Sequence, residues 1–348
     1  MDNLIYHFTT PNTKYVAAFD LDNTLITTKS GKVFPKDKDD YKLLYDNVLD
    51  KLKDLTDKNY KIVIFSNQKG IGLGKINTNI ITHKINKLFP NADYFLSLKD
   101  DLYRKPMIGM YEKFIELNGK PKKMFYVGDA AGRSGDHSYA DINFAFNCNI
   151  KFYTQDRYFL NIKTKVYHYC PSLPSTPNNI SDLKKYNENV IIIMQGFPAC
   201  GKSTFIKNYV DYHNISDYTH LSNDTHTKSQ IKKLIKQSIN DEKLIFIDNL
   251  NATKKNRKEI IDLVTDNEYN IIGIHITTPM EYSQALNKQR YYYTSKDPNY
   301  TYKGKNYKKI PNVAYNVFKK NFQEMTKDEG FYKIIKFLPD IKLDYCFV

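Results

Sequence analysis

Short apolar runs rich in β-branched and aromatic residues alternate with helix-period segments along the chain. Between the first two runs, Leu44, Val48, Leu52 and Leu55 recur at helical spacing and predict an amphipathic helix. Strand–helix alternation favours parallel sheets with helices on both faces, so the predicted fold class is α/β. Ligands of such sheets gather at the carboxyl ends of the strands. The predicted strands are Tyr15–Phe19, Lys61–Phe65, Met124–Val127, Val190–Met194, Leu244–Ile247 and Ile271–Ile276.

The alternation breaks clearly at Cys170–Leu183 (CPSLPSTPNNISDL), where three prolines stand among Ser, Thr and Asn. Polar, proline-rich sequence of this kind is typical of a linker. A chain of 348 residues also fits two domains of roughly 150–180 residues better than one. We therefore predict two doubly wound domains, at residues 1–168 and 188–348, joined by a linker at 169–187.

The chain is basic, with a net charge of +14 and a pI near 9.2. An excess of positive charge on a chain that also carries acidic catalytic motifs suggests an anionic polymer as partner. The alternative, that the lysines only aid solubility, is left open by charge alone.

The four cysteines (Cys148, Cys170, Cys200 and Cys346) are widely spread and form no CxxC pair. This spacing favours free thiols in a reducing compartment. The first ten residues lack the basic and apolar regions of a signal peptide, and no run approaches the ~20 apolar residues of a membrane span. We expect a soluble intracellular protein of the nucleus or cytoplasm, or of a replication compartment if the source is a virus.

The first chemical motif follows the predicted strand Tyr15–Phe19 directly, as Asp20-Leu21-Asp22-Asn23-Thr24. The loop after a strand can turn alternate residues into one crevice. Asp20 would then attack phosphorus as a nucleophile, and Asp22 would act as general acid and base. Mg²⁺ is expected, because it screens the repulsion between a carboxylate and a phosphate ester, with Asp20 and Asp22 among its ligands.

Four further pieces follow in order. Ser66 and Asn67 come after the second strand and can hold phosphate oxygens, and Lys105 can neutralise the phosphate. Asp129 follows the third strand as a metal ligand, and Asp141 is an outer or second-shell metal ligand. Any one of these alone is more often an ordinary loop residue, and DxDxT alone is also compatible with a surface turn. Their order at successive strand ends favours a phosphatase site.

These motifs resemble the haloacid-dehalogenase (HAD) superfamily and, more narrowly, the phosphatase domain of the polynucleotide kinase 3′-phosphatases. The resemblance covers about residues 14–160. It implies a Rossmann-like HAD domain that removes 3′-phosphates. The strings that carry the resemblance are FDLDNTL, FSNQKGIG, RKPMIGMY, VGDAAGR and DHSYADINFAFN.

The second motif, GFPACGKS, matches the P-loop pattern GxxxxGK[ST] between a predicted strand and a predicted helix at Thr204–Tyr212. Its glycines let backbone N–H groups surround phosphates, Lys202 would bridge the β- and γ-phosphates, and Ser203 would hold Mg²⁺. ATP is the expected cofactor. The expected nucleotide-binding residues are Gly196, Phe197, Pro198, Ala199, Cys200, Gly201, Lys202, Ser203, Thr204 and Asp248.

Three residues are candidates for the transfer chemistry. Asp224 would act as the base for an incoming hydroxyl, with a helix N-cap for the segment Thr225–Ile239 as the alternative. Asp248 would orient the Mg²⁺ shell after the strand Leu244–Ile247, or else serve as a turn residue. Arg290 would stabilise the transferring phosphoryl group, or else be an exposed arginine.

The second half also resembles the polynucleotide kinase 3′-phosphatases, through GFPACGKSTF, IDNLNAT and the tail Lys309–Phe337. The resemblance implies ATP-dependent phosphorylation of 5′-hydroxyl ends by a P-loop kinase, in the eukaryotic domain order. Asn223 stands where those enzymes usually have an arginine, which leaves the grip on the acceptor end open. We expect no FHA module, because the phosphatase motif begins near residue 15.

The stretch Tyr291–Lys309 interleaves tyrosines with lysines and suggests either contacts with unpaired bases and phosphates or a solvated lid. Together these features predict a monomeric enzyme that repairs DNA ends and hands them to a ligase. The alternatives are an RNA end-healing enzyme, a nucleoside phosphatase/kinase and a catalytically weak end-binding scaffold.

Overall fold

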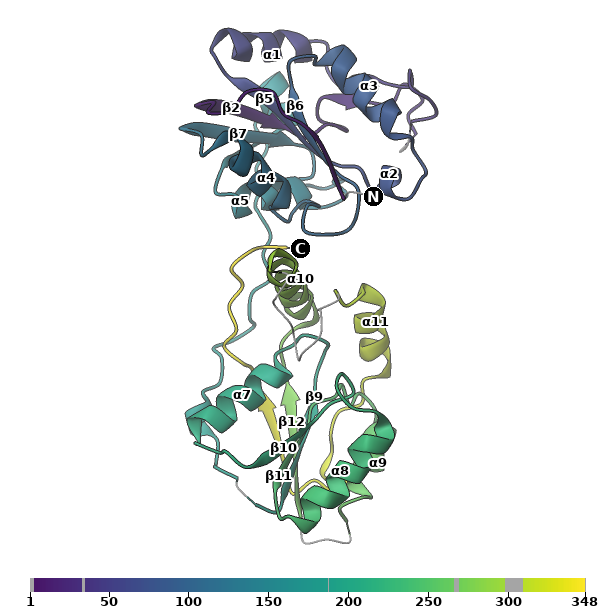
Figure 1. Ribbon diagram of the computed structural model, residues 1–348, viewed down its shortest axis with the longest axis vertical. Helices are drawn as coiled ribbons and strands as arrows, with labels where there is room; N and C mark the ends of the chain where they lie inside the picture. The colour runs from purple at the N-terminus through teal and green to yellow at the C-terminus, as the bar shows by residue number, and fades with distance from the viewer. Residues whose placement is uncertain (1–2, 33–34, 187, 266–268, 298–308, 348) are drawn as a thin grey trace. The chain divides into compact units, whose positions relative to one another are not determined.

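The computed structural model describes residues 3–32, 35–186, 188–265, 269–297 and 309–347, and it divides the chain into two compact units (Figure 1). Unit 1 comprises Met1–Cys170 with Tyr345–Val348, and unit 2 comprises Pro171–Asp344. Residues 171–187 of the segment 169–187 that we predicted as a linker therefore count with unit 2, and the last four residues count with unit 1. Both units are α/β, as the alternation predicts.

Unit 1 has a six-stranded sheet in the order β1-β6-β5-β2-β7-β8, parallel except for β1 against β6. Its strands are β1 (Leu4–His7), β2 (Tyr15–Phe19), β5 (Lys61–Asn67), β6 (Asp93–Ser97), β7 (Lys123–Gly128) and β8 (Lys151–Thr154), with β3 (Ile26–Thr27) and β4 (Lys42–Leu43) in a separate pair. Its helices are α1 (Val48–Asp57), α2 (Lys69–Gly72), α3 (Thr78–Leu88), α4 (Gly109–Asn118), α5 (Ala140–Asn147) and α6 (Gln155–Leu160).

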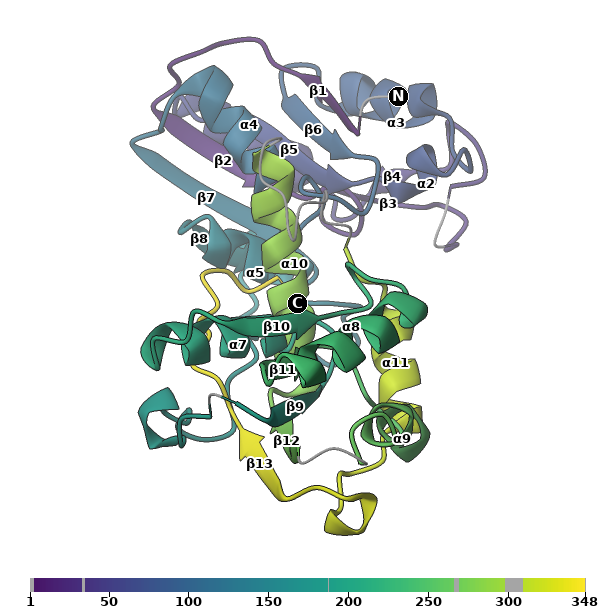
Figure 2. The ribbon, with the colours of Figure 1, turned by 60° about the horizontal axis from the view of Figure 1, so that its bottom comes forward.

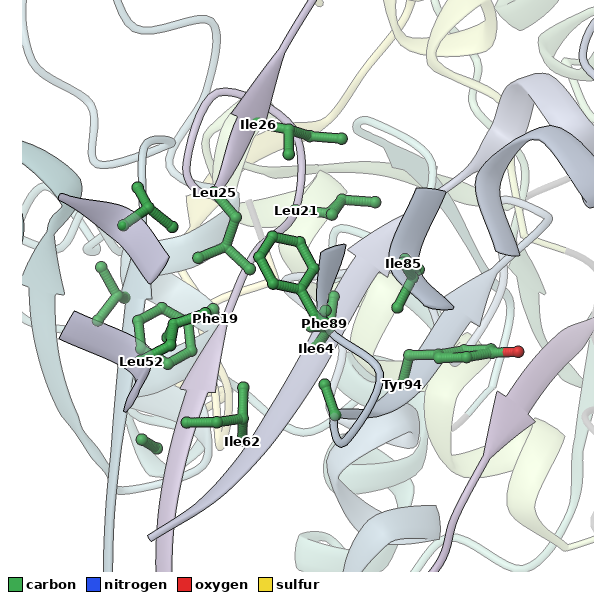
Figure 3. Close-up of a cluster of buried hydrophobic side chains, with 14 of the residues drawn as sticks. Phe19, Leu21, Leu25, Ile26, Leu52, Ile62, Ile64, Ile85, Phe89 and Tyr94 are labelled. Carbon is green, nitrogen blue, oxygen red and sulfur yellow. The ribbon is translucent and has the colours of Figure 1, made fainter. Parts of the chain in front are cut away.

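Strand alternation gives the unit 1 sheet two apolar faces. Phe19 and Ile64 face α1 and α3 through Leu52 and Ile85, in the cluster of buried side chains that Figure 3 shows. Phe65 of β5 faces the opposite way and packs against Phe114 of α4 and Phe144 of α5. A sheet covered on both faces can only offer a site at its ends.

Unit 2 has a five-stranded, fully parallel sheet in the order β10-β11-β9-β12-β13. Helix α7 lies on one side of it and α8 and α9 on the other (Figure 1). The elements are η1 (Ile180–Asp182), β9 (Val190–Gln195), α7 (Lys202–Tyr212), β10 (Tyr218–Leu221), α8 (Lys228–Asn240), β11 (Leu244–Ile247), α9 (Lys254–Ile261), β12 (Asn270–Ile276), α10 (Met280–Lys296), α11 (Asn312–Asn321), η2 (Lys327–Glu329) and β13 (Lys333–Phe337). Figure 2 shows the same sheet from a second side.

Two sequence-based expectations are wrong. Cys170 and Cys346 form a disulfide across a separation of 176 residues, whereas Cys148 and Cys200 are free and buried. A pairing over such a distance leaves no local spacing signal. Leu44 lies before the helix it was assigned to, because its N–H donates to the carbonyl of Leu25 beside the β3–β4 pair.

In the described part of the chain, no helix combines the length and apolar character that crossing a membrane requires.

Arg257 of α9 ties this helix to the polypeptide that precedes β13. Its guanidinium is fully buried and makes paired bonds to the Glu329 carboxylate at 2.7 and 2.8 Å. It also donates to the carbonyls of Asn251 at 3.0 Å and Gln323 at 2.9 Å. A buried charge with this many partners holds several loops at once.

We expect Arg257→Met to destabilise unit 2 by about 3–5 kcal/mol, because it leaves Glu329 buried without its partner. Hydrogen exchange should show faster exchange of the β12 and β13 amides and no change in unit 1. The matched control is Lys258→Met, which removes only an exposed pair with Asp262 and should cost under about 0.5 kcal/mol. Equal exchange rates in both variants would contradict this role.

Candidate active sites

The first site lies at the carboxyl edge of the unit 1 sheet. Asp20 follows β2, Ser66 and Asn67 end β5, and Asp129 follows β7. Because β2 pairs in parallel with both β5 and β7, these residues emerge side by side. The structure therefore brings together most of the residues that the sequence assigned to a phosphatase.

A compact group of charges forms the centre of this site. One carboxylate oxygen each from Asp20, Asp129 and Asp141 lie within 4.8 Å of one another. The ammonium of Lys105 donates to Asp20 Oδ1 at 2.6 Å and to Asp141 Oδ1 at 2.7 Å. It also donates to the hydroxyl of Tyr126 at 2.7 Å, and Tyr126 in turn donates to Asp141 at 2.8 Å.

The pKa values of Asp20 and Asp129 are both raised, so Lys105 does not fully compensate the burial and mutual repulsion of these two carboxyl groups. Burial raises the pKa of Asp20 well above its ordinary value, and Lys105 only partly opposes this. Burial and then the neighbouring Asp141 raise the pKa of Asp129 to about 7. Three hard oxygen ligands that repel one another in a small space fit a divalent cation such as Mg²⁺.

Gly128 makes room for Asp141. A Cβ atom at position 128 would lie 2.5 Å from Asp141 Cγ, so a side chain here would displace the carboxylate. Asp141 Oδ2 also accepts the N–H of Ala130 at 3.0 Å. Asp141 is thus fixed against the loop that carries Asp129.

Arg133 supports the same loop from the other side. It donates to the carbonyl of Asp129 at 3.0 Å and forms ion pairs with Asp136 and Asp156. Arg133 was not predicted as a site residue, although it ends the VGDAAGR string.

Asp22 lies outside the group of Asp20, Asp129 and Asp141. The residue as a whole is exposed to solvent, although other groups surround its carboxyl. Close packing around its carboxyl raises its pKa, and the hydrogen bond from Gln68 opposes that shift. Gln68 Nε2 donates to Asp22 Oδ2 at 2.6 Å and to Ser66 Oγ at 2.9 Å, and Gln68 is only 4% exposed. Gln68 was not predicted from sequence and links the Asp22 carboxylate to the Ser66 hydroxyl.

Asn67 has a different neighbour from the one expected. Its side-chain amide accepts the N–H of Lys105 at 2.9 Å and donates to the Lys105 carbonyl at 3.2 Å. This pair of bonds anchors the backbone that presents the Lys105 ammonium.

The second site begins at the loop after β9. Gly201, at φ +103°, precedes α7, which starts at Lys202. A Cβ on Gly196 would lie 2.6 Å from the buried Cys200 Sγ, so Cys200 fills the space that Gly196 leaves. Lys202 Nζ donates to the carbonyls of Gly196 at 3.1 Å and Phe197 at 2.8 Å.

Asp248, at the end of β11, joins this loop. Its Oδ2 accepts the Ser203 hydroxyl at 2.5 Å and lies 3.0 Å from His220 Nε2 of β10. The alternative of a plain turn residue does not account for these two bonds. His220 was not predicted from sequence.

A pocket of about 1140 Å³ opens beside the loop. Asp224, Asp248 and Arg290 line it together with Lys202 and Ser203, although they come from separate elements. The other predicted nucleotide-binding residues that line it are Pro198, Ala199, Cys200, Gly201 and Thr204. Gly196 and Phe197 contribute the carbonyls that hold Lys202 instead.

Asp224 is not the N-cap of the following helix. Helix α8 begins at Lys228, and its cap is Thr227, which forms a capping box with Gln230. The helix-cap alternative for Asp224 is therefore wrong. Within the tyrosine-rich stretch, the residues up to Lys296 belong to α10, and 298–308 lie outside the described residues.

The two units are thus an α/β domain with a phosphatase-type acidic site and an α/β domain with a nucleotide-binding P-loop. Residues 15–159 match the family described as Polynucleotide kinase 3 phosphatase, and residues 190–320 match the one described as Chromatin associated protein KTI12. The Bifunctional polynucleotide phosphatase/kinase of Schizosaccharomyces pombe is 36% identical over 333 residues, covering 92% of this chain and 78% of its own. The chain belongs to the family of bifunctional polynucleotide phosphatase/kinases and is an enzyme.

Two other relatives agree with this assignment. A protein of Acanthamoeba polyphaga mimivirus with the same two-activity description is 29% identical over 369 residues, covering 92% of this chain and 83% of its own. The Polynucleotide 3′-phosphatase ZDP of Arabidopsis thaliana is 36% identical over 176 residues, which cover 43% of this chain and 24% of ZDP.

The raised pKa of Asp129 predicts how pH affects the metal-free protein. With a pKa of about 7 when folded and 3.8 as the ordinary value, Asp129 binds protons more tightly in the folded state. Stability in EDTA should therefore fall as pH rises from about 4 to about 7 and level off above that, and Mg²⁺ should raise Tm more at the higher pH. Thermal melts with EDTA or Mg²⁺ measure both effects. Asp129→Asn is the control, and an equal pH dependence in this variant would contradict the assignment.

The hydrogen bonds from Gln68 to Asp22 and Ser66 predict that the loss of phosphatase activity on removing Gln68 depends on the leaving group of the substrate. If Gln68 orients Asp22 as a general acid, Gln68→Ala should lower kcat about 10- to 100-fold on a nucleotide 3′-phosphate, whose leaving alkoxide needs a proton. It should change kcat for p-nitrophenyl phosphate, whose leaving group needs none, by less than about threefold. Equal losses on both substrates would show a general structural role instead.

Proposed function

We propose that this chain repairs nucleic-acid ends, removing 3′-phosphates at the Asp20 site and phosphorylating 5′-hydroxyls at the Lys202 site. The products, a 3′-hydroxyl and a 5′-phosphate, are the ends that a ligase joins. DNA ends are the proposed substrate, with Mg²⁺ and ATP as cofactors.

The phosphatase reaction begins at Asp20. One of its carboxylate oxygens attacks phosphorus, the bond from phosphorus to the 3′-oxygen breaks, and Asp22 gives its proton to that oxygen. The hydrogen bond from Gln68 Nε2 to Asp22 Oδ2 holds the carboxyl group in place for this role. An aspartyl-phosphate remains on Asp20.

Asp22 then acts as a base. It takes a proton from a water molecule, whose oxygen attacks phosphorus, and the bond between phosphorus and Asp20 breaks to release inorganic phosphate. Lys105 neutralises charge on Asp20 and the phosphoryl group throughout. Ser66 donates to a phosphate oxygen, while Asn67 positions Lys105.

Asp20, Asp129 and Asp141 fit a Mg²⁺ ion, and Lys105 contacts both Asp20 and Asp141. When bound, the ion supplies positive charge that screens the approach of the carboxylate to the phosphate ester.

In the second unit, the P-loop residues hold the phosphates of ATP, and Lys202 turns from the carbonyls of Gly196 and Phe197 towards them. Asp224 takes the proton of the 5′-hydroxyl, whose oxygen attacks the γ-phosphorus, and ADP leaves. Ser203 and Asp248 orient Mg²⁺, and Arg290 neutralises charge on the phosphoryl group.

The observation that carries the proposal is that each unit brings one complete set of groups together by itself: the Asp20 set in unit 1 and the Lys202 set in unit 2.

The test uses a nicked duplex with a 3′-phosphate and a 5′-hydroxyl, incubated with Mg²⁺ and ATP. Asp20→Asn should abolish dephosphorylation by at least about 1000-fold and leave phosphorylation intact. Lys202→Ala should do the reverse. Acid-stable capture of ³²P on the wild-type protein, absent in Asp20→Asn, would report the aspartyl-phosphate.

Loss of both reactions from either single change would contradict the assignment of two sites. Activity on free nucleotides without activity on the duplex would point to a metabolite enzyme, and a preference for RNA ends over DNA ends would replace the proposed substrate.

A further inference from the structure

The pocket of unit 2 is longer than the phosphates of a nucleotide require. Beyond Asp224 it continues along α8, where Lys228, Ile231, Lys232 and Ile235 line it. Helix α8 starts shortly after Asp224, so the distance from the proposed base increases along the helix. An acceptor whose hydroxyl lies at Asp224 would therefore extend beside α8.

Lys228 and Lys232 form a regular pair of charges. They stand four residues apart on one helix face, about 6 Å along the axis. Both are exposed, and within the described residues neither ammonium makes a hydrogen bond or an ion pair. Lys233 and Lys236 of the same helix do not line the pocket.

The part of the pocket lining that comes from α9 and α11 is largely apolar. Ile260 and Leu263 line it from α9 and its C-terminal end, and Val317 and Phe318 line it from α11. Figure 1 shows α8 and α9 beside the second sheet and α11 above them. Glu259 also lines the pocket from α9, and its positively charged lining residues include Lys202 of α7 and Arg290 of α10 besides Lys228 and Lys232 of α8.

A pocket lined by lysines of one helix and by apolar residues of its neighbours suits a single-stranded nucleic acid. Lysines follow the phosphates of the backbone, and the faces of the bases contact apolar and aromatic side chains. A nucleoside or a small metabolite would leave the lysines without a counter-charge. The pocket therefore favours an acceptor with at least two phosphodiester groups.

Resting on the proposed function, we propose that Lys228 and Lys232 bind the first and second phosphodiesters of the acceptor strand, counted from the 5′-hydroxyl. Lys228 is the first residue of α8, four residues after Asp224, and takes the first phosphodiester, whereas Lys232 lies about one turn further along and takes the second. The bases of these nucleotides lie against Val317 and Phe318.

This register, in which Lys228 binds the first phosphodiester and Lys232 the second, can be tested with acceptors of different length. A dinucleotide has one phosphodiester and a trinucleotide has two, both with a free 5′-hydroxyl and no 3′-phosphate. Lys228→Gln should raise KM for both acceptors about tenfold, the size of one charge-assisted hydrogen bond. Lys232→Gln should raise KM for the trinucleotide by a similar factor and leave the dinucleotide unchanged.

Two controls accompany these variants. Lys233→Gln removes an equal charge that does not line the pocket and should change neither KM. KM for ATP should stay the same in all three variants, which also reports correct folding. On a longer single strand, the salt dependence of binding should lose about 0.7 in slope for each pocket lysine removed.

A change in KM for ATP, an equal effect of Lys233→Gln, or an effect of Lys232→Gln on the dinucleotide would overturn this register. Equal wild-type efficiency on a nucleoside and a trinucleotide would also overturn it while leaving the kinase assignment intact. A wild-type protein that phosphorylates no acceptor at all would instead contradict the proposed function.

Discussion

Parallel pairing places β2 between β5 and β7, with Phe19 opposite both Ile64 and Val127. This register delivers the residues after each strand to one edge, where Asp20 and Asp129 meet. The second sheet follows the same rule, since the N–H of Asp248 bonds to the carbonyl of Leu221 at 2.8 Å and ties the ends of β10 and β11 together. Both sites depend on this backbone geometry before any side chain acts.

The lysines discussed for the two sites differ in their exposure to solvent. In unit 1, Lys105 is buried and bonded to Asp20 and Asp141, because charges removed from water must be paired. In unit 2, Lys228 and Lys232 remain in water, where an unpaired ammonium costs little. A buried centre suits the reacting phosphoryl group, and a solvated row of cations suits a polymer that must enter and leave.

Local patterns made much of this structure predictable. The strands Tyr15–Phe19 and Leu244–Ile247 appear with the predicted bounds, because period and β propensity are properties of short segments. The sequence did not reveal Gln68 or His220, since an isolated glutamine or histidine acquires a role only from the partner opposite it. The disulfide between Cys170 and Cys346 was not predicted for the same reason, because the two cysteines lie 176 residues apart.

The sequence by itself determined the α/β class, the order of the two units and the chemical types at each strand end, because these follow from periodicity and short motifs. Only the tertiary structure decided which of those groups meet: Lys105 with Asp20, Gln68 with Asp22, and Asp248 with Ser203. It also decided which lysines of α8 face the pocket. Such distances arise from the packing of sheets and helices that are remote in the chain, and no local pattern encodes them.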